Sequence, residues 1–202
     1  MSATPHNPIG MRTSAQLDLL EPVSVLPQGF VYRPELISRA EEAELIGHFE
    51  ALPFREFEFH GYLGKRRTVS FGLHYDFADM KVHETQSIPP FLLPLRDRSA
   101  EFAHIDPDAV QHALVTEYAP GAPIGWHRDR PVFGDVIGVS FASSCRFRFR
   151  RKLGSGWERA AIILEPRSAY LLRGPARTGW EHSIPPAEER RYSVTFRTVR
   201  GS

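Results

Sequence analysis

Three side chains in the second half of the sequence have the types and order of a metal-ligand set. His127 and Asp129 are separated by one residue, and His182 lies downstream between Trp180 and Pro185. In an extended chain, residues i and i+2 point to the same side, so the imidazole and the carboxylate can approach one ion together. The His-x-Asp pair alone is also consistent with a surface histidine beside an acid. With His182, however, the set has two imidazoles and one carboxylate, which bind non-haem iron(II) and leave coordination positions open.

A second polar pattern follows the last of these histidines. If residues 190–197 form a strand, one of its faces is apolar and the other carries Arg191, Ser193, Thr195 and Arg197. A buried arginine needs an anionic partner, because an unpaired buried charge is costly. A dicarboxylate co-substrate could supply that partner through bidentate contacts. The alternative is that the arginine face is solvated. Together with the iron set, the pattern favours the co-substrate.

The elements that must position these residues fall into two halves. Ser38–Glu41 is a capping-box pattern, and apolar residues follow on one face, which predicts a helix over residues 38–52. A second helix is expected after Pro89-Pro90, with Pro94 in its first turn. Residues 1–28 contain four prolines and no sustained apolar period, which indicates a loosely ordered arm.

From residue 113 onward the apolar period changes to two. Short strand-like segments separated by Gly and Pro turns are expected at residues 113–118, 136–141, 145–150, 160–164, 169–173 and 192–198. We place His182 in a loop just after one of these strands. Helices followed by many short antiparallel strands predict an α+β domain whose β part is a sandwich or jelly roll.

Composition places the chain among ordinary globular proteins. The sequence of 202 residues is 42% hydrophobic and 24% charged, and its net charge is +1. Attraction to nucleic acid would have to come from local clusters such as residues 146–152, whose arginines form either a polar outer sheet face or a binding stripe. No apolar run approaches the roughly 20 residues that span a bilayer. With one cysteine, Cys145, and no signal-like N-terminus, we expect no membrane association and a cytoplasmic location.

The tracts LVTEYAPGAPIGWHRD, WEHSIPP and RYSVTFR resemble the AlkB family of 2-oxoglutarate- and iron(II)-dependent dioxygenases. The resemblance is specific over about residues 113–198 and looser before them. It implies a double-stranded β-helix, or jelly-roll, core with N-terminal helices packed against it. It also implies one domain over residues 29–202, with helices and a substrate-covering region in 29–112 and the catalytic jelly roll in 113–200.

The resemblance also implies roles for individual residues. His127, Asp129 and His182 match the iron ligands. Arg191 would pair with the distal carboxylate of 2-oxoglutarate and Arg197 would lie near the chelating end, while Tyr118 matches a tyrosine that hydrogen-bonds the co-substrate. Two positions differ from the family pattern. Thr116 stands where the family often has asparagine, and Pro131 stands where some members carry an acid that pairs with the second arginine.

The reaction implied by the family is oxidative demethylation with Fe(II), 2-oxoglutarate and O2. Its products are succinate, CO2 and formaldehyde, and its common substrates are N-alkylated bases such as 1-methyladenine and 3-methylcytosine. A target base must be single-stranded or flipped out to reach the iron. The segment 65–75 resembles the substrate-covering region, with Arg67, Phe71 and Tyr75 as candidate substrate residues. Equally, it could be an amphipathic hairpin with Phe71 in the core.

Alkylated DNA or RNA is therefore the expected partner, and a monomer is expected. Two other readings remain. The same iron chemistry could act on a protein or on a physiological RNA modification. A non-catalytic nucleic-acid-binding module is the third reading, but a pure binding protein would need neither the iron set nor the paired arginines.

Overall fold

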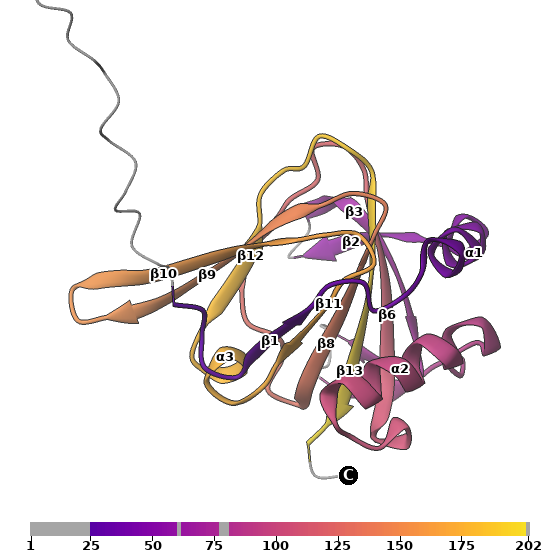
Figure 1. Ribbon diagram of the computed structural model, residues 1–202, viewed down its shortest axis with the longest axis horizontal. Helices are drawn as coiled ribbons and strands as arrows, with labels where there is room; N and C mark the ends of the chain where they lie inside the picture. The colour runs from indigo at the N-terminus through magenta and orange to yellow at the C-terminus, as the bar shows by residue number, and fades with distance from the viewer. Residues whose placement is uncertain (1–24, 60–61, 77–80, 201–202) are drawn as a thin grey trace, which may run out of the picture.

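Two antiparallel sheets face one another in the computed structural model, which describes residues 25–59, 62–76 and 81–200. The major sheet has the strand order β1-β11-β8-β13-β6-β3-β2, and the minor sheet has the order β10-β9-β12-β7 (Figure 1). The major strands are β1 (Phe30–Arg33), β2 (Arg55–Phe59), β3 (Tyr62–Phe71), β6 (Val110–Tyr118), β8 (Phe133–Phe141), β11 (Ala169–Leu172) and β13 (Arg191–Val199). The minor strands are β7 (Ile124–His127), β9 (Cys145–Leu153), β10 (Gly156–Leu164) and β12 (Glu181–Ile184).

Three further pieces complete the described chain. A small separate sheet pairs β4 (Leu73–Asp76) with β5 (Lys81–Glu84). The helices are α1 (Arg39–Glu50), α2 (Leu93–Ala103) and the short α3 (Gly174–Thr178), with 3-10 turns at Pro90–Leu92 and Pro107–Ala109. Sequential strands that cross between two facing sheets form a jelly roll, as expected from the sequence. Among the described residues, no helix is both long and apolar enough to cross a membrane.

Helix α1 forms where the capping box predicts it. The Ser38 hydroxyl accepts the backbone N–H of Glu41 at 3.2 Å, and the Glu41 carboxylate accepts the Ser38 N–H at 2.7 Å. Leu45 and Phe49 on the same face are buried, and the Phe49 ring meets Phe141 of β8 edge-on at 5.2 Å. The helix therefore packs its apolar stripe on the major sheet.

Helix α2 also begins where proline predicts it. The chain enters through a 3-10 turn after Pro89, and Pro94 occupies the first helical turn. Leu95, Ala100 and Phe102 are buried against the sheet. Figure 1 shows α1 and α2 on the side of the major sheet away from the minor sheet.

The two faces of the major sheet differ in chemistry. On β13, Tyr192, Val194 and Phe196 belong to the core cluster beneath the helices. The alternate residues of β13, namely Arg191, Ser193, Thr195 and Arg197, therefore face the minor sheet. A second apolar cluster fills the space between the sheets and includes Phe147, Phe149, Leu172 and Trp180. The candidate site therefore lies where the polar inner face of the major sheet meets this second apolar cluster.

Some expectations for the elements were wrong or incomplete. His182 lies within strand β12 and not in a loop after a strand. The sequence pattern also did not reveal β1 or the four-residue length of β7. Residues 1–24 of the expected N-terminal arm lie outside the described residues, so that expectation stays a prediction.

Candidate metal centre

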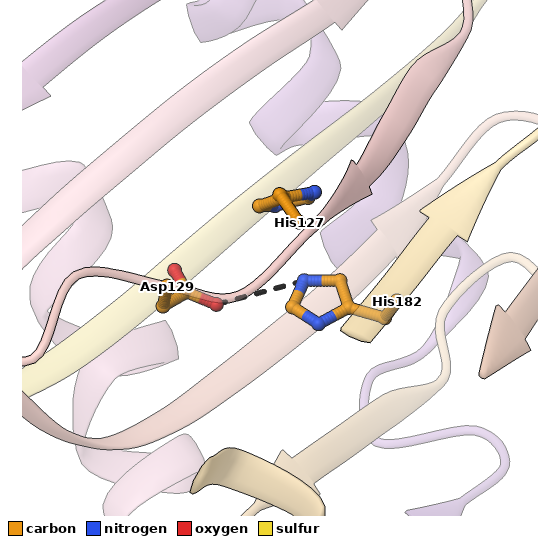
Figure 2. Close-up of side chains that lie close together, drawn as sticks. All are labelled: His127, Asp129 and His182. Carbon is orange, nitrogen blue, oxygen red and sulfur yellow. Dashed lines mark ion pairs between the residues drawn. The ribbon is translucent and has the colours of Figure 1, made fainter. Parts of the chain in front are cut away.

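The three predicted ligands converge on one point between the sheets (Figure 2). His127 ends β7, Asp129 follows two residues later, and His182 lies opposite His127 in the pairing of β12 with β7. The two imidazole rings are 4.3 Å apart between centroids, and His182 Nε2 is 3.6 Å from Asp129 Oδ2. One ligand atom from each residue can be chosen so that all three lie within 4.8 Å of one another. This spacing suits the coordination of a single ion.

Local contacts fix the tautomer of His127 and the ring orientation of His182. His127 Nδ1 lies 2.9 Å from the backbone carbonyl of Gly125. A carbonyl can only accept, so Nδ1 carries the proton and Nε2 keeps its lone pair for a metal. His182 stacks on Phe147 at 5.2 Å, which fixes its ring plane.

The electrostatics of the set favour metal binding over proton binding. Burial lowers the pKa of His182 to about 3 and also lowers the pKa of His127. Burial alone would raise the pKa of the Asp129 carboxyl, but nearby positive charge, chiefly Arg197, outweighs it and holds this pKa well below its usual range. Two neutral imidazoles and one carboxylate are the protonation states that a divalent cation requires.

Arg197 pairs directly with the carboxylate of the candidate metal site. Its Nε and Nη2 lie 2.9 and 2.7 Å from Asp129 Oδ1. Its Nη1 lies 3.2 Å from Nδ1 of buried His112, and its guanidinium lies over the Phe133 ring. Asp129 is thus the acidic partner of Arg197. The acid that some family members use for this purpose is replaced here by Pro131. The arginine orients the carboxylate and keeps it ionised.

Arg191 lies deeper on the same strand face and is only 2% exposed. Its Nε and Nη2 bond to the Ser140 hydroxyl at 3.1 and 2.9 Å, but its buried Nη1 has no hydrogen-bond partner among the described residues. Its charge interacts with the Cys145 thiol and with the phenols of Tyr118 and Tyr170, and no described carboxylate pairs with it. A buried cation with an unused donor fits an anionic group that comes from outside the chain.

Tyr118 and Thr116 share the inner face of the major sheet with Arg191. In the pairing of β6 with β13, Tyr118 is opposite Arg191 and Thr116 is opposite Ser193. The Arg191 guanidinium lies 4.9 Å from the centre of the Tyr118 ring, and the Tyr118 hydroxyl is 3.4 Å from the Ser193 hydroxyl. On the inner face of the major sheet, hydroxyl groups therefore surround one buried arginine.

The structure adds Tyr170, which the sequence did not single out. Its hydroxyl interacts electrostatically with Asp129, Tyr118 and Arg191, and burial and the Asp129 charge raise its pKa, so it stays protonated. Gly138 lies opposite Tyr170 on β8, and a Cβ at Gly138 would collide with the phenol ring and its hydroxyl. The only available signal was a glycine within a predicted strand, which marks a close approach without naming the partner.

Arg177 of α3 is a second addition. This buried side chain donates to four backbone carbonyls, two in the loop that leaves β7 and two at the start of β8, at 2.6 to 3.1 Å. The acceptors are the carbonyls of Asp129, Arg130, Phe133 and Gly134. Arg177 therefore holds the loop that carries the carboxylate ligand. No sequence pattern distinguishes it from the surface arginines around it.

Two of the three candidate substrate residues need correction. Arg67 is bonded to Glu117 at 2.6 Å on the helix side of the major sheet, and Phe71 is buried in the core there. The arginine of β3 on the inner face is Arg66, which lies opposite Tyr118 and acts electrostatically on His127 and Arg197. Tyr75 lies in β4, but its side chain is outside the described residues. The hairpin interpretation of Phe71 is therefore the right one.

Comparisons with known proteins agree with this geometry. The 2OG-Fe(II) oxygenase superfamily matches residues 31–197. The chain is 26% identical to the "Alkylated DNA repair protein ALKBH8 homolog" of Arabidopsis thaliana over 236 aligned positions, which cover 96% of this chain and 66% of that protein. It is 33% identical over 99 residues to the uncharacterized protein L905 of Acanthamoeba polyphaga mimivirus, covering 43% of this chain and 47% of that one. The chain thus spans less than two thirds of the length of either relative.

A solved structure gives the same fold. The structure of OsALKBH1 superposes with a TM-score of 0.65 at 16% sequence identity, over 86% of this chain and 98% of that one. The match to the superfamily extends over nearly all of the described residues and includes the three converging ligands. The chain belongs to the 2OG-Fe(II) oxygenase superfamily, whose members are 2-oxoglutarate-dependent dioxygenases, and it is an AlkB-like member of it.

Proposed function

We propose that this protein is an oxidative demethylase of N-alkylated nucleobases in DNA or RNA, such as 1-methyladenine and 3-methylcytosine. One observation carries the proposal: His127, Asp129 and His182 converge between the sheets, and on the inner face of the major sheet Arg191 is buried with no described partner for its Nη1. The ligand set accounts for a metal, and the arginine accounts for an anionic co-substrate. The name of the Arabidopsis relative, an alkylated-DNA repair protein, supports the substrate class.

Each of these inner-face residues has a role in this proposal. Bound iron(II) and 2-oxoglutarate would supply the oxidation of a substrate C–H bond by O2, with succinate and CO2 as co-products. Arg191 would take the distal carboxylate through Nη1, which is otherwise unsatisfied. The hydroxyls of Tyr118 and Ser193 would bond to co-substrate oxygens, and Arg197 would hold Asp129 in its ligating position. The residues thus supply positioning and charge complementarity.

The products distinguish this reaction from other uses of the same site. Insertion of one oxygen atom into an N-methyl C–H bond gives a hydroxymethyl amine, which breaks down to the free amine and formaldehyde. One formaldehyde should therefore form for each succinate when the substrate is a methylated base. Oxidation of a protein side chain would give succinate with no such formaldehyde from a nucleic acid.

The test is anaerobic reconstitution with iron(II), addition of 2-oxoglutarate, and exposure to O2 with methylated or unmethylated oligonucleotides. We expect succinate and formaldehyde in equal amounts only with the methylated strand. The Asp129→Ala variant is the control for adventitious iron, because it lacks the carboxylate ligand. Succinate formation that is the same with methylated, unmethylated and no oligonucleotide would contradict the proposed substrate class.

A further inference from the structure

The outer face of the minor sheet is a basic and aromatic surface that the metal site does not use. On β9, Phe147 and Phe149 point into the core, so the alternate residues point outward. On β7 and β12, His127 and His182 point inward, and their preceding neighbours point outward. We call the resulting surface the outer face; it consists of Trp126, Arg146, Arg148, Arg150, Lys152, Trp157, Arg159 and Glu181. Figure 1 shows the β9–β10 hairpin reaching beyond the rest of the sheet.

Its cations and indole rings are interleaved. The Arg150 guanidinium lies 4.5 Å from the centre of the Trp126 ring and 4.4 Å from that of Trp157. Arg148 lies 5.0 Å from the Trp126 ring, and Lys152 lies 5.3 Å from the Trp157 ring. These contacts hold the positive groups in place on the sheet surface, so that little side-chain entropy is lost when an anion binds.

The charge on this face is poorly balanced. Glu181 pairs with Arg150 at 2.6 Å, and it is the only acid among the described residues that forms an ion pair with the outer face. Moreover, Arg159 lies directly opposite Arg150 in the pairing of β10 with β9. Like charges in this position destabilise a sheet. A merely solvated face has no need for an unfavourable pair, whereas a polyanion that covers both arginines would remove the repulsion.

We propose that the outer face binds single-stranded nucleic acid as a site separate from the metal centre. Arg146, Arg148, Arg150 and Lys152 alternate along one strand, which spaces successive cations by about 6.6 Å, comparable to phosphates along an extended single strand. Trp157 is 40% exposed and offers an aromatic surface on which a base can stack. Because His127 and His182 point to the other side of this sheet, a strand bound here would not block the metal.

The first experiment measures binding of a labelled, unmethylated single-stranded oligonucleotide to the full chain without metal or co-substrate. A chain that lacked the demethylation proposed above would still show this binding, so the two proposals fail separately. We compare the triple variant Arg146→Ser, Lys152→Ser, Arg159→Ser with the control triple Arg33→Ser, Arg39→Ser, Arg55→Ser. All six side chains are exposed, so the two variants match in lost charge and in exposure.

We expect the outer-face triple to weaken binding and to reduce the slope of log affinity against log salt by about two units. The control triple should change the slope little. Trp157→Ala should weaken binding roughly fivefold or more, and Trp157→Phe should retain most of it. Arg159→Ser alone should also weaken binding. It should keep or raise the melting temperature, because it removes the like-charge pair, so unfolding would not explain the weaker binding.

Several results would overturn the proposal. Equal loss in the two triple variants would mean that net charge, and not this face, attracts the oligonucleotide. Equal affinity for duplex and single strand, with no effect of Trp157→Ala, would remove the single-strand assignment. Absence of oligonucleotide binding at low salt, with binding to anionic vesicles or self-association that the outer-face triple abolishes, would assign the face to a membrane or to a second copy instead.

Discussion

At the scale of single residues, Arg191 is the strongest guide to what binds beside the metal site. Its guanidinium is buried and bonds to the Ser140 hydroxyl, and its Nη1 has no hydrogen-bond partner among the described residues. We expect Arg191→Gln to raise the 2-oxoglutarate concentration needed for half-maximal turnover by roughly a hundredfold, because a charge-assisted bidentate contact is lost. The matched control is Arg190→Gln at the adjacent, largely exposed position. If both variants behaved like the wild type, the anchor would have to be another group.

The protonation of the histidines gives a second residue-scale prediction. The folded chain keeps His182 neutral down to about pH 3, and the pKa of His127 is also lowered by burial. Protons therefore compete weakly with a metal. We expect manganese(II) affinity, measured by calorimetry, to fall clearly less between roughly pH 7.5 and 5.5 than it would for two ordinary histidines. Two ordinary histidines would lose about a hundredfold over the same range, and a loss of that size would contradict the burial argument.

The same shift has a consequence for stability. As the pH falls below the ordinary histidine value of 6.5, the unfolded chain binds a proton at His182 and the folded chain does not until about pH 3. The unfolded state is therefore favoured, and the metal-free protein should lose stability within this window as the pH falls. Denaturant melts at stepped pH would show this, and the His182→Asn variant should lose less.

At the scale of elements, the loop after β7 depends on the short helix α3. Arg177 donates to two carbonyls of this loop, including that of Asp129 itself, and to two more at the start of β8. We expect Arg177→Met to reduce the free energy of unfolding by about 2–4 kcal/mol, because buried carbonyls lose their donors. It should also weaken metal binding under conditions where the variant is still folded. Arg128→Met removes one exposed contact to Thr178 and should do neither.

Strands β8 and β11 pack closely where the Tyr170 ring lies against Gly138. Because a Cβ at Gly138 would occupy the space of the phenol, Gly138→Ala should destabilise the protein by about 1–3 kcal/mol. Truncation of the ring by Tyr170→Ala should relieve that clash, so the two substitutions should be non-additive in chemical denaturation. Strict additivity would mean that the ring is displaced without cost.

Strand phase also explains which parts of the site could be read from the sequence. Alternation along residues 66–71 shows that Arg66 and Arg67 face opposite ways, but it does not show which of them faces inward. That choice depends on pairing with β6, where Arg66 meets Tyr118. On β13 the same question of which face points inward was answered by the three candidate iron ligands earlier in the chain. Arg191 and Arg197 were therefore assigned correctly to the inner face. His182 was misplaced because a four-residue strand is too short to display a period.

At the scale of the whole molecule, features set by local sequence could be predicted, whereas features set by long-range contacts could not. The capping box at Ser38 and the proline entry to α2 are determined within a few residues, so α1 was predicted near its observed bounds and α2 near its observed start. The strands from residue 113 onward were found by alternation. The order of strands in the two sheets, the clamp by Arg177 and the Tyr170 contact depend on residues far apart in the chain. No local pattern encodes these contacts.

The fold as a whole brings two separate surfaces to the minor sheet: a metal site on its inner side and a basic, aromatic outer face. The central claim concerns the inner side, where one iron(II) ion and one 2-oxoglutarate are expected to bind together. Anaerobic titration of the metal-free protein with iron(II) and 2-oxoglutarate, followed by the visible absorption of the chelate, tests this claim most directly.

The wild type should give a band that saturates at about one iron per chain. Asp129→Ala should give none, and Arg191→Gln should need much more co-substrate to reach the same band. A wild-type band that persists unchanged in Asp129→Ala would contradict the assignment of the metal site.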